Sequence, residues 1–569
     1  MKETTVFRMR WLVVGLAALT LGSAACSEDS TGPTVVPAPA GLAVTQVTLT
    51  RVNLGWTAVT NATSYVLERT SAATPGVFSA IGGAVTGTSY LDTTVAAGVI
   101  YGYRVAAVVG SDTSEFSAVA TFATGVATTR IAANITASRT LYADTLYTLS
   151  GYVKVTNGAT LTIQPGTRIL GDTTVAGSSL WILRGAKINA SGTAAAPIVF
   201  TSARAPGNRR PGDWGGIIII GNGIINRTGT AILTEGGAAG QAENYAGGTD
   251  NNDNSGVLRY VRIEFAGYDI SNGAGQELNS LSSYAVGRGT TYEYIQTLTG
   301  LDDSFEWWGG AVDGRYLISY ESGDDHFDWT EGYRGRSQFL IALQTQRLTP
   351  APGAGTFSSD PHSFEGDGCE PTVSGCTLSA TGTSTPYSNP VFANFTMIGT
   401  GQLAGIPADG NGSVLRRGTS GTFRNGVLAR WKGIAINIRD AWTDSLFVGS
   451  GGRDSLDLQA ILLAQNGFNL DTTGAGFAQS ANWPAARLAT LKQYASGVAV
   501  DTLLGFTLNP SGLDWTPKAG SPATSGGVAA PAARVAGYFG GSWVNTTYLG
   551  AADPTGPKWW QGWTYYAIN

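Results

Sequence analysis

The feature that most constrains the fold is a pattern that the chain states twice, 22 residues apart. In the first copy, the apolar run 294–298 precedes an acidic turn and Phe305-Glu306-Trp307; in the second, the run 316–320 precedes an acidic turn and Phe327-Asp328-Trp329. A constant period of this length, with a short apolar strand and a polar turn, is typical of a solenoid. Residues one period apart then lie about 4.8 Å apart, so we expect Phe305 to stack on Phe327.

The rest of the C-terminal three quarters continues this theme of short strands and glycine corners. Residues 158–169 are echoed by residues 180–188, and Gly166 and Gly185 mark equivalent turns. Strand, corner and strand without alternating helices predict a right-handed parallel β-helix with three-sided coils, whose core includes Phe364. The weaker alternative is a second β-sandwich. Helical periodicity is scarce, and residues 485–492 are the best short candidate.

Composition excludes some classes of function. The chain has 569 residues, of which 13% are charged and 78 are glycine, which is typical of extracellular β-rich proteins. Its length indicates two or more domains, although a solenoid has no upper size limit. A formal net charge of -5 argues against a nucleic-acid partner.

The N-terminus has the pattern of an export signal. A basic segment with Lys2, Arg8 and Arg10 precedes the apolar residues 11–21 and the sequence Ser23-Ala24-Ala25-Cys26. This pattern resembles a bacterial lipoprotein signal, which implies that residues 1–25 are removed and that Cys26 is lipidated. We therefore expect a lipid-anchored protein at the outer membrane and cell surface, with residues 26–38 as a flexible tether. The alternative is an ordinary signal peptide without lipidation.

Two cysteines remain besides Cys26. Cys369 and Cys376 lie close together in a glycine-containing stretch, and in an oxidising compartment such a pair is expected to form a disulfide.

Residues 39–123 form the first predicted domain. Short alternating runs indicate a seven-strand sandwich, and Trp56, Tyr65 and Tyr101-Gly102-Tyr103-Arg104-Val105 resemble a fibronectin type III domain. The resemblance places Tyr101 at the tyrosine corner. We interpret this domain as a spacer between membrane and body.

The body, residues 134–569, also carries a resemblance. Its specific blocks are 159–167, 212–216, 253–267, 302–307 and 562–564. They resemble a family of large bacterial cell-surface and secreted parallel β-helix lipoproteins. The resemblance implies the architecture, and it brings no established reaction with it.

The acidic turns of the repeat are candidate metal ligands. Stacked carboxylates repel one another, so they need a cation or generous solvation. Calcium, which takes six to eight oxygen ligands in relaxed geometry, is the cation that we expect. The alternative is a solvated acidic turn. The predicted ligands, which Glu365 and Asp367 could extend, are Asp302, Asp303, Glu306, Asp324, Asp325 and Asp328.

For function, we favour a cell-surface protein that binds polysaccharide or matrix glycan. Trp307, Trp308 and Trp329 are the predicted stacking faces. The alternative is a polysaccharide hydrolase or lyase that uses the stacked carboxylates, because many pectin-degrading enzymes are parallel β-helices and Gly323-Asp324-Asp325 resembles an element of polygalacturonases.

Overall fold

The computed structural model describes residues 36–71, 76–236, 239–271, 273, 275–379, 382–401, 410–447, 456–471 and 485–566. Two compact units make up the chain, Met1–Gly125 and Val126–Asn569. The predicted signal, Cys26 and most of the tether lie outside the described residues. No helix in the described part is long and apolar enough to cross a membrane.

The N-terminal unit is a fibronectin type III-like β-sandwich, as its sequence predicts. The three-stranded antiparallel sheet contains β1 (Ala43–Thr48), β2 (Arg51–Gly55) and β5 (Ser89–Asp92). The five-stranded antiparallel sheet contains β3 (Ser64–Ser71), β4 (Ser79–Val85), β6 (Ile100–Val109), β7 (Asp112–Thr113) and β8 (Ala120–Ala123). Trp56 packs edge-to-face on Tyr65 with ring centroids 5.3 Å apart. The hydroxyl of Tyr101 accepts a hydrogen bond from the Ala96 amide at 2.9 Å, which closes the tyrosine corner.

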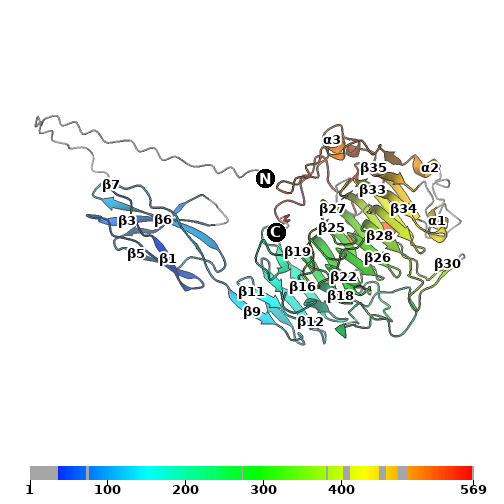
Figure 1. Cartoon of the computed structure of the whole chain (residues 1–569), viewed down its shortest axis with the longest axis horizontal. Coiled ribbons are helices and arrows are strands. Elements are labelled where there is room, and N and C mark those ends of the chain that lie inside the picture. The colour runs from blue at the N-terminus through cyan, green and yellow to red at the C-terminus, as the bar shows by residue number, and fades with distance from the viewer. Residues whose placement is uncertain are drawn as a thin grey trace, which may run out of the picture. The chain divides into compact units, whose positions relative to one another are not determined.

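The C-terminal unit is a right-handed parallel β-helix with three strand-bearing faces (Figure 1). Its early coils carry separate strands on the first two faces. On the first face these are β9 (Ala127–Ile131), β11 (Thr145–Leu149), β14 (Arg168–Gly171) and β17 (Ile198–Ser202). On the second face they are β10 (Arg139–Leu141), β13 (Thr160–Ile163) and β16 (Lys187–Ser191).

From β19 onward, one long strand covers both of these faces. The first half of β19 pairs with β16 and its second half with β17, so two strands have merged into one. The long strands are β19 (Gly256–Glu264), β23 (Thr291–Leu298), β25 (Asp313–Tyr320), β27 (Arg336–Leu343), β31 (Val391–Ile398), β33 (Gly421–Ala429) and β35 (Leu456–Ala464), and the short β37 (Leu491–Gln493) follows.

The third face is a separate ten-stranded parallel sheet. It contains β12 (Tyr152–Val155), β15 (Ser179–Ile182), β18 (Gly216–Ile220), β22 (Leu281–Tyr284), β24 (Phe305–Trp308), β26 (Phe327–Thr330), β28 (His362–Asp367), β32 (Asn411–Arg416), β34 (Ile434–Ile438) and β36 (Phe468–Leu470). Two small hairpins lie outside the coils, β20 (Tyr268–Asp269) with β21 (Glu277–Leu278) and β29 (Leu378–Ser379) with β30 (Gly382–Thr383).

The predicted 22-residue register is confirmed. β24 pairs with β26 so that Phe305 lies opposite Phe327, and their rings stack with centroids 5.2 Å apart. Phe364 continues this inward row, at 5.7 Å from Phe327, and all three rings are buried.

Two tryptophans predicted to contact glycan belong to the core instead. Side chains alternate along a strand, so Trp307 and Trp329 point inward like the phenylalanines two positions before them. They are 1% and 0% exposed. A Cβ on Gly366 would lie 2.1 Å from the Trp329 ring, so the next coil carries glycine where a third tryptophan would collide. Prediction of Trp307 and Trp329 as stacking faces was therefore wrong.

Each long strand bends at a residue with left-handed backbone geometry. In β19, β23, β25 and β27 this residue is Tyr260, Tyr294, Tyr316 and Phe339, with φ between 48° and 64°. Bulky residues rarely adopt this geometry. Here the four rings stack in sequence, with centroids 4.3, 4.4 and 5.1 Å apart, and this stacking offsets the backbone cost.

After β37 the chain runs back along the outside of the long strands as a C-terminal strap, residues 500–566 (Figure 1). Trp563 packs edge-on against Tyr260 and Tyr294, and Trp559 packs against Tyr316. The strap is mostly irregular, with α3 (Val500–Leu504), η3 (Pro522–Thr524), α4 (Ala532–Val535) and η4 (Tyr538–Gly540). It buries a second apolar cluster that the coil interior does not reach.

The boundaries differ in detail from those expected. The first strand of the body, β9, begins at Ala127, ahead of residue 134. The helix expected at 485–492 is the single turn α2 (Ala485–Leu488), because Leu491 already starts β37. The remaining helix, α1 (Ala441–Phe447), follows β34.

Candidate functional site: an acidic cleft on the third face

The outward side of the third face carries a row of acidic side chains. Because Phe305, Phe327 and Phe364 point inward, the residues that follow them must point outward. These are Glu306, Asp328 and Glu365, and the strand register places them opposite one another in successive coils. The repeat thus sets an acidic ladder outside the aromatic ladder.

This row lies in a cleft of about 400 Å³. Its walls come from the loop between β18 and β19, residues 221–255, and from the loop after β28, which begins at residue 368. The lining residues include Arg227, Leu233, Thr234, Glu235, Tyr245, Gln276, Tyr284, Glu306, Trp308, Asp328, Thr330, Glu331, Glu365, Asp367, Glu370, Val373, Arg416 and Arg417.

The predicted disulfide is confirmed, and it supports one wall of the cleft. It links Cys369 to Cys376. Inside the loop that it closes, the carbonyl of Gly375 accepts from the Thr228 amide at 2.9 Å, and the carbonyl of Ser374 accepts from Nε of Arg227 at 2.7 Å. The two walls are thereby tied to each other.

One of the three predicted tryptophans does line the cleft. Trp308 follows Trp307 and therefore points outward, where its ring stacks on Tyr284 with centroids 3.9 Å apart and an interplanar angle of 11°. Only 7% of Trp308 is exposed, so the cleft exposes a small part of this aromatic pair. Contact of Trp308 with glycan stays a prediction.

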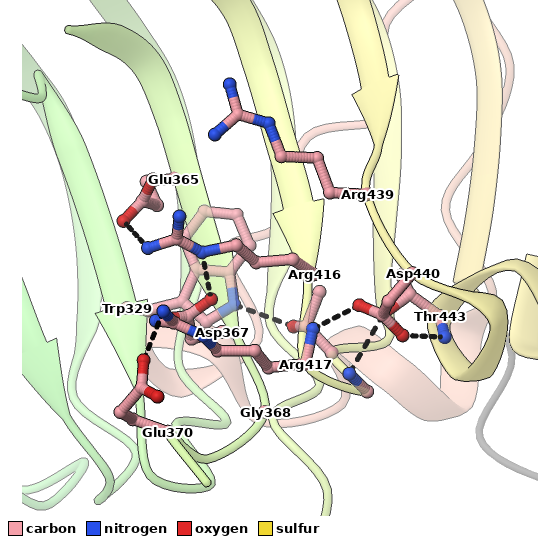
Figure 2. A network of polar contacts seen from close by, with 12 residues as sticks. Trp329, Glu365, Asp367, Gly368, Glu370, Arg416, Arg417, Arg439, Asp440 and Thr443 are labelled. Atoms are coloured by element: carbon pink, nitrogen blue, oxygen red, sulfur yellow. Dashed lines mark hydrogen bonds and ion pairs between the residues drawn. The ribbon is translucent and has the colours of Figure 1, made fainter. Parts of the chain in front are cut away.

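Arg416, the last residue of β32, and the following Arg417 complete the floor (Figure 2). Arg416 lies between the carboxylates of Glu365 and Asp367 and reaches Asp367 with Nε at 2.9 Å. Arg417 bridges Asp367 and Glu370. These charge-assisted contacts hold the carboxylates in fixed orientations.

The acidic turns lie next to the row of Glu306, Asp328 and Glu365, and they accept backbone hydrogen bonds between successive coils. Asn279, Asp303 and Asp325 occupy equivalent positions in successive coils. Each lies two residues before the inward-pointing residue that begins a strand of the third face. Each side-chain oxygen accepts a backbone N–H from the next coil: Asn279 from Asp303 at 3.1 Å, Asp303 from Asp325 at 2.8 Å, and Asp325 from His362 at 2.5 Å. Asp303 and Asp325 are thus buried caps of the coil corner.

The carboxyl groups crowd one another enough to change their protonation. Burial, followed by repulsion from Asp328, raises the pKa of Glu306 well above its ordinary value. Burial, followed by repulsion from Glu365, does the same to the pKa of Asp328. Burial, followed by repulsion from Asp367, raises the pKa of Glu365 to about 7. The row therefore contains groups that can hold a proton near neutral pH.

All six predicted metal ligands lie in this region, but they fall into different groups. Oxygens of Asp302, Asp303 and Asp324 lie within 4.8 Å of one another, and so do oxygens of Asp303, Glu306 and Asp328. Asp325 groups instead with His362 and Glu365. Burial raises the pKa of Asp302, Asp303 and Asp325, with repulsion adding to it, and raises that of Asp324 to about 6. Calcium binding by these turns stays a prediction.

Sequence reasoning missed several residues of the cleft. Tyr284, Arg227, Arg416 and Arg417 come from other coils and loops, and nothing in the 22-residue repeat points to them. His362 had a usable signal: it lies two residues before Phe364, as Asp325 lies two before Phe327. The offset between those coils is 37 residues, so the insertion hid the match.

The fold and the cleft define a class: parallel β-helix proteins with a polar cleft on one sheet face. Residues 133–482 match the family model described as a pectate-lyase-like β-helix domain, and the chain belongs to this family.

Other similarities cover short parts of the chain. A 71-residue stretch is 44% identical to a poly(3-hydroxybutyrate) depolymerase of Ralstonia pickettii and covers 12% of this chain and 13% of that protein. An Fn3-like protein from Clostridium thermocellum is 32% identical over 16% of this chain and 92% of its own, with a TM-score of 0.15. A fibronectin type III domain of human collagen XX is 21% identical over 18% of this chain and 100% of its own, with a TM-score of 0.14.

Proposed function

We propose that this chain is a cell-surface polysaccharide-binding protein whose binding site is the acidic cleft of the third face. The observation that carries the proposal is the cleft itself, which combines the Trp308–Tyr284 pair with a fixed row of carboxyl and guanidinium groups. Sugar recognition uses an aromatic surface for the apolar face of a ring and oriented polar groups for its hydroxyls. Membership in a pectate-lyase-like family and the short similarity to a depolymerase support a role on a polymer.

The charges in the cleft favour a neutral polysaccharide. Among the described residues, seven carboxyl groups and three arginines line it, and Arg416 and Arg417 already contact carboxylates. An acidic polysaccharide would meet this excess of carboxyl groups and would need a bridging cation. Neutral, hydroxyl-rich chains can instead donate to the carboxylates and accept from the arginines.

Cleavage of the bound polysaccharide is the second candidate. It is favoured by Glu306 and Asp328, which lie side by side on adjacent strands and whose pKa values are both raised. A protonated carboxyl next to an ionised one is the arrangement that glycoside hydrolysis requires.

The location follows from the N-terminal prediction. A lipid on Cys26, the tether and the fibronectin type III-like domain would hold the β-helix away from the outer membrane. This arrangement suits capture of an extracellular polymer.

An array experiment tests the proposal. The full-length exported protein is incubated with neutral and uronic-acid polysaccharides, each with calcium and with chelator, and the soluble products are analysed by mass spectrometry. We expect binding to at least one neutral polysaccharide in both conditions. Binding only to uronic-acid polymers with calcium would overturn the neutral-ligand assignment, and no binding to any polysaccharide would overturn the function. New oligosaccharides that disappear in Glu306→Gln and Asp328→Asn would establish cleavage.

A further inference from the structure

The residue at the capping position of the coil corner is Asn or Asp in four of the described coils and histidine in one. Asn279, Asp303 and Asp325 each cap the next coil, and Asn411, one coil beyond His362, does so again by accepting from the Ile434 amide at 2.8 Å. An amide oxygen therefore suffices for this task. His362 occupies the equivalent position between Asp325 and Asn411, and a histidine ring has no oxygen with which to cap.

The His362 ring is buried and faces carboxylates on both sides. Only 2% of the residue is exposed. Nδ1 lies 2.8 Å from Oδ1 of Asp325 and 3.4 Å from Oε1 of Glu365, while Nε2 lies 3.1 Å from Oδ1 of Asp360. Despite these short distances, neither ring nitrogen makes a hydrogen bond of acceptable geometry with any residue that the structure describes. A buried imidazole without such a bond needs another partner.

The surroundings orient the ring for a ligand at Nδ1. Asp360 is fixed by Arg439, whose Nη1 lies 2.8 Å from its Oδ2, and by the Asn411 amide nitrogen at 3.3 Å from its Oδ1. With the Asp360 carboxylate beside Nε2, the ring can donate its Nε2–H there and offer Nδ1 to an ion held between Asp325 and Glu365. Metal-binding histidines commonly have this carboxylate behind them.

We propose that His362 Nδ1, Asp325 and Glu365 bind a divalent transition-metal ion such as zinc, at a buried position that Glu365 connects to the cleft. Their three ligand atoms lie within 4.8 Å of one another. Glu365 lines the cleft, so the ion would have an open side toward solvent. This site has a different ligand set from the calcium site predicted at the acidic turns, with Asp325 common to both, and it does not depend on glycan binding.

The distances fit a transition metal, and the ligand types favour one over calcium. Metal–ligand distances of about 2.0–2.2 Å place neighbouring ligand atoms about 2.8–3.6 Å apart in octahedral or tetrahedral geometry. The observed separations from Nδ1 are 2.8 and 3.4 Å. Calcium takes six to eight oxygen ligands and does not favour imidazole, so a histidine ligand argues against it.

Metal titration of the full-length protein tests the proposal. Protein dialysed against chelator is titrated with zinc and, separately, with calcium by calorimetry, and bound metal is counted by elemental analysis. We expect one zinc per chain at this site, with an imidazole ligand in the zinc X-ray absorption spectrum. His362→Gln and Glu365→Gln should each weaken zinc binding at least about tenfold, and Asp360→Asn about tenfold through loss of ring orientation.

Asp302→Asn is the matched control, because it removes a neighbouring carboxylate outside the proposed ligand set. It should bind zinc like the wild type. If His362→Gln fails to fold, as judged by its melting curve, Glu365→Gln decides. The proposal is overturned if zinc does not bind, if its binding survives both ligand substitutions, or if Asp302→Asn loses it to the same extent.

Discussion

At the scale of single residues, the acidic turns show two kinds of requirement at one position. The cap needs only an oxygen that accepts a backbone N–H, as Asn279 and Asn411 demonstrate. Asp303 and Asp325 meet that need with carboxyl groups that are buried beside other carboxyl groups. A carboxyl group at this position adds electrostatic repulsion, and the cap could be made without it. This indicates that the carboxyl groups of Asp303 and Asp325 have a role besides capping the coil.

Substitution of Asp303 separates the cap from its charge. In calcium-free buffer, Asp303→Ala should lower the free energy of unfolding by about 1–3 kcal/mol, because the Asp325 N–H loses its acceptor in a buried place. Asp303→Asn keeps the acceptor and removes the charge, so it should be at least as stable as the wild type. Urea unfolding measures both. Equal losses in the two variants would show that the charge itself stabilises the corner.

Calcium adds a second measurement on the same residues. If calcium binds the acidic turns, it should raise the melting temperature of the wild type and leave that of Asp303→Asn/Asp325→Asn unchanged. A rise of equal size in both proteins would place the ion elsewhere.

The buried row of phenylalanines could be predicted from the sequence, and the residues around the outward carboxylates could not. A strict 22-residue offset is sufficient to stack Phe305 on Phe327, since coil length alone fixes that register. Alternation of side chains along the same strand buries Trp307 and turns Trp308 outward, so neighbouring tryptophans of one strand have different environments. Arg416 reaches the row from a later coil of different length, and no sequence period marks it.

At the scale of elements, the long strands and the strap depend on each other. Tyr260, Tyr294 and Tyr316 hold a backbone geometry that bulky residues avoid, and the strap covers the rings that make it tolerable. The sequence predicts the apolar runs 294–298 and 316–320, which are the second halves of β23 and β25. The bend itself could not be predicted, because only stacking and cover compensate the unfavourable φ.

Removal of the Trp563 side chain should loosen the strap. This ring is 1% exposed and contacts Tyr260 and Tyr294, so Trp563→Ala should cost about 3–5 kcal/mol of strap docking. Limited proteolysis should then cut within residues 500–566 while the coils stay intact. A digestion pattern identical to that of the wild type would show that the strap does not rely on this contact.

Docking of the strap should also depend on pH through Glu321. This buried carboxyl accepts from the Thr345 amide at 2.9 Å and contacts the Tyr566 hydroxyl, and burial raises its pKa above 4.5 despite these hydrogen bonds. A raised pKa in the folded state contributes stability that is complete below pH 4.5 and is lost as pH rises through the folded pKa. The melting temperature of the wild type relative to Glu321→Gln should therefore fall from pH 4.5 upward. A constant difference across this range would show that Glu321 titrates normally.

At the scale of the whole molecule, the chain combines two units with different folds. The fibronectin type III-like unit is a small sandwich with its own core, and the β-helix carries the cleft. Both folds were predictable, because turn spacing and strand length identify a sandwich and a repeat identifies a solenoid. The cleft was not, since it forms between loops of unequal length that carry no repeat.

Attachment to the membrane is a prediction about the mature chain. Cys26→Ala should release the protein from the membrane fraction or leave it unprocessed, because no thiol would remain for the lipid. Fractionation and mass spectrometry of the N-terminus measure this. Unchanged processing together with unchanged membrane association would contradict lipidation.

The most direct test of the central claim is the affinity of the cleft for the neutral polysaccharide that binds best on the array. Calorimetry compares the wild type with Trp308→Ala in the cleft and with Tyr142→Ala, an aromatic residue of the same unit that is 52% exposed outside it. If Trp308→Ala lowers the melting temperature, Leu233→Ala replaces it as the cleft variant, because Leu233 lines the cleft and is 55% exposed. We predict that the Trp308 substitution weakens binding at least about tenfold, a loss of about 1.4 kcal/mol, and that Tyr142→Ala binds like the wild type. Wild-type affinity in both cleft variants would contradict the claim that this cleft is the binding site.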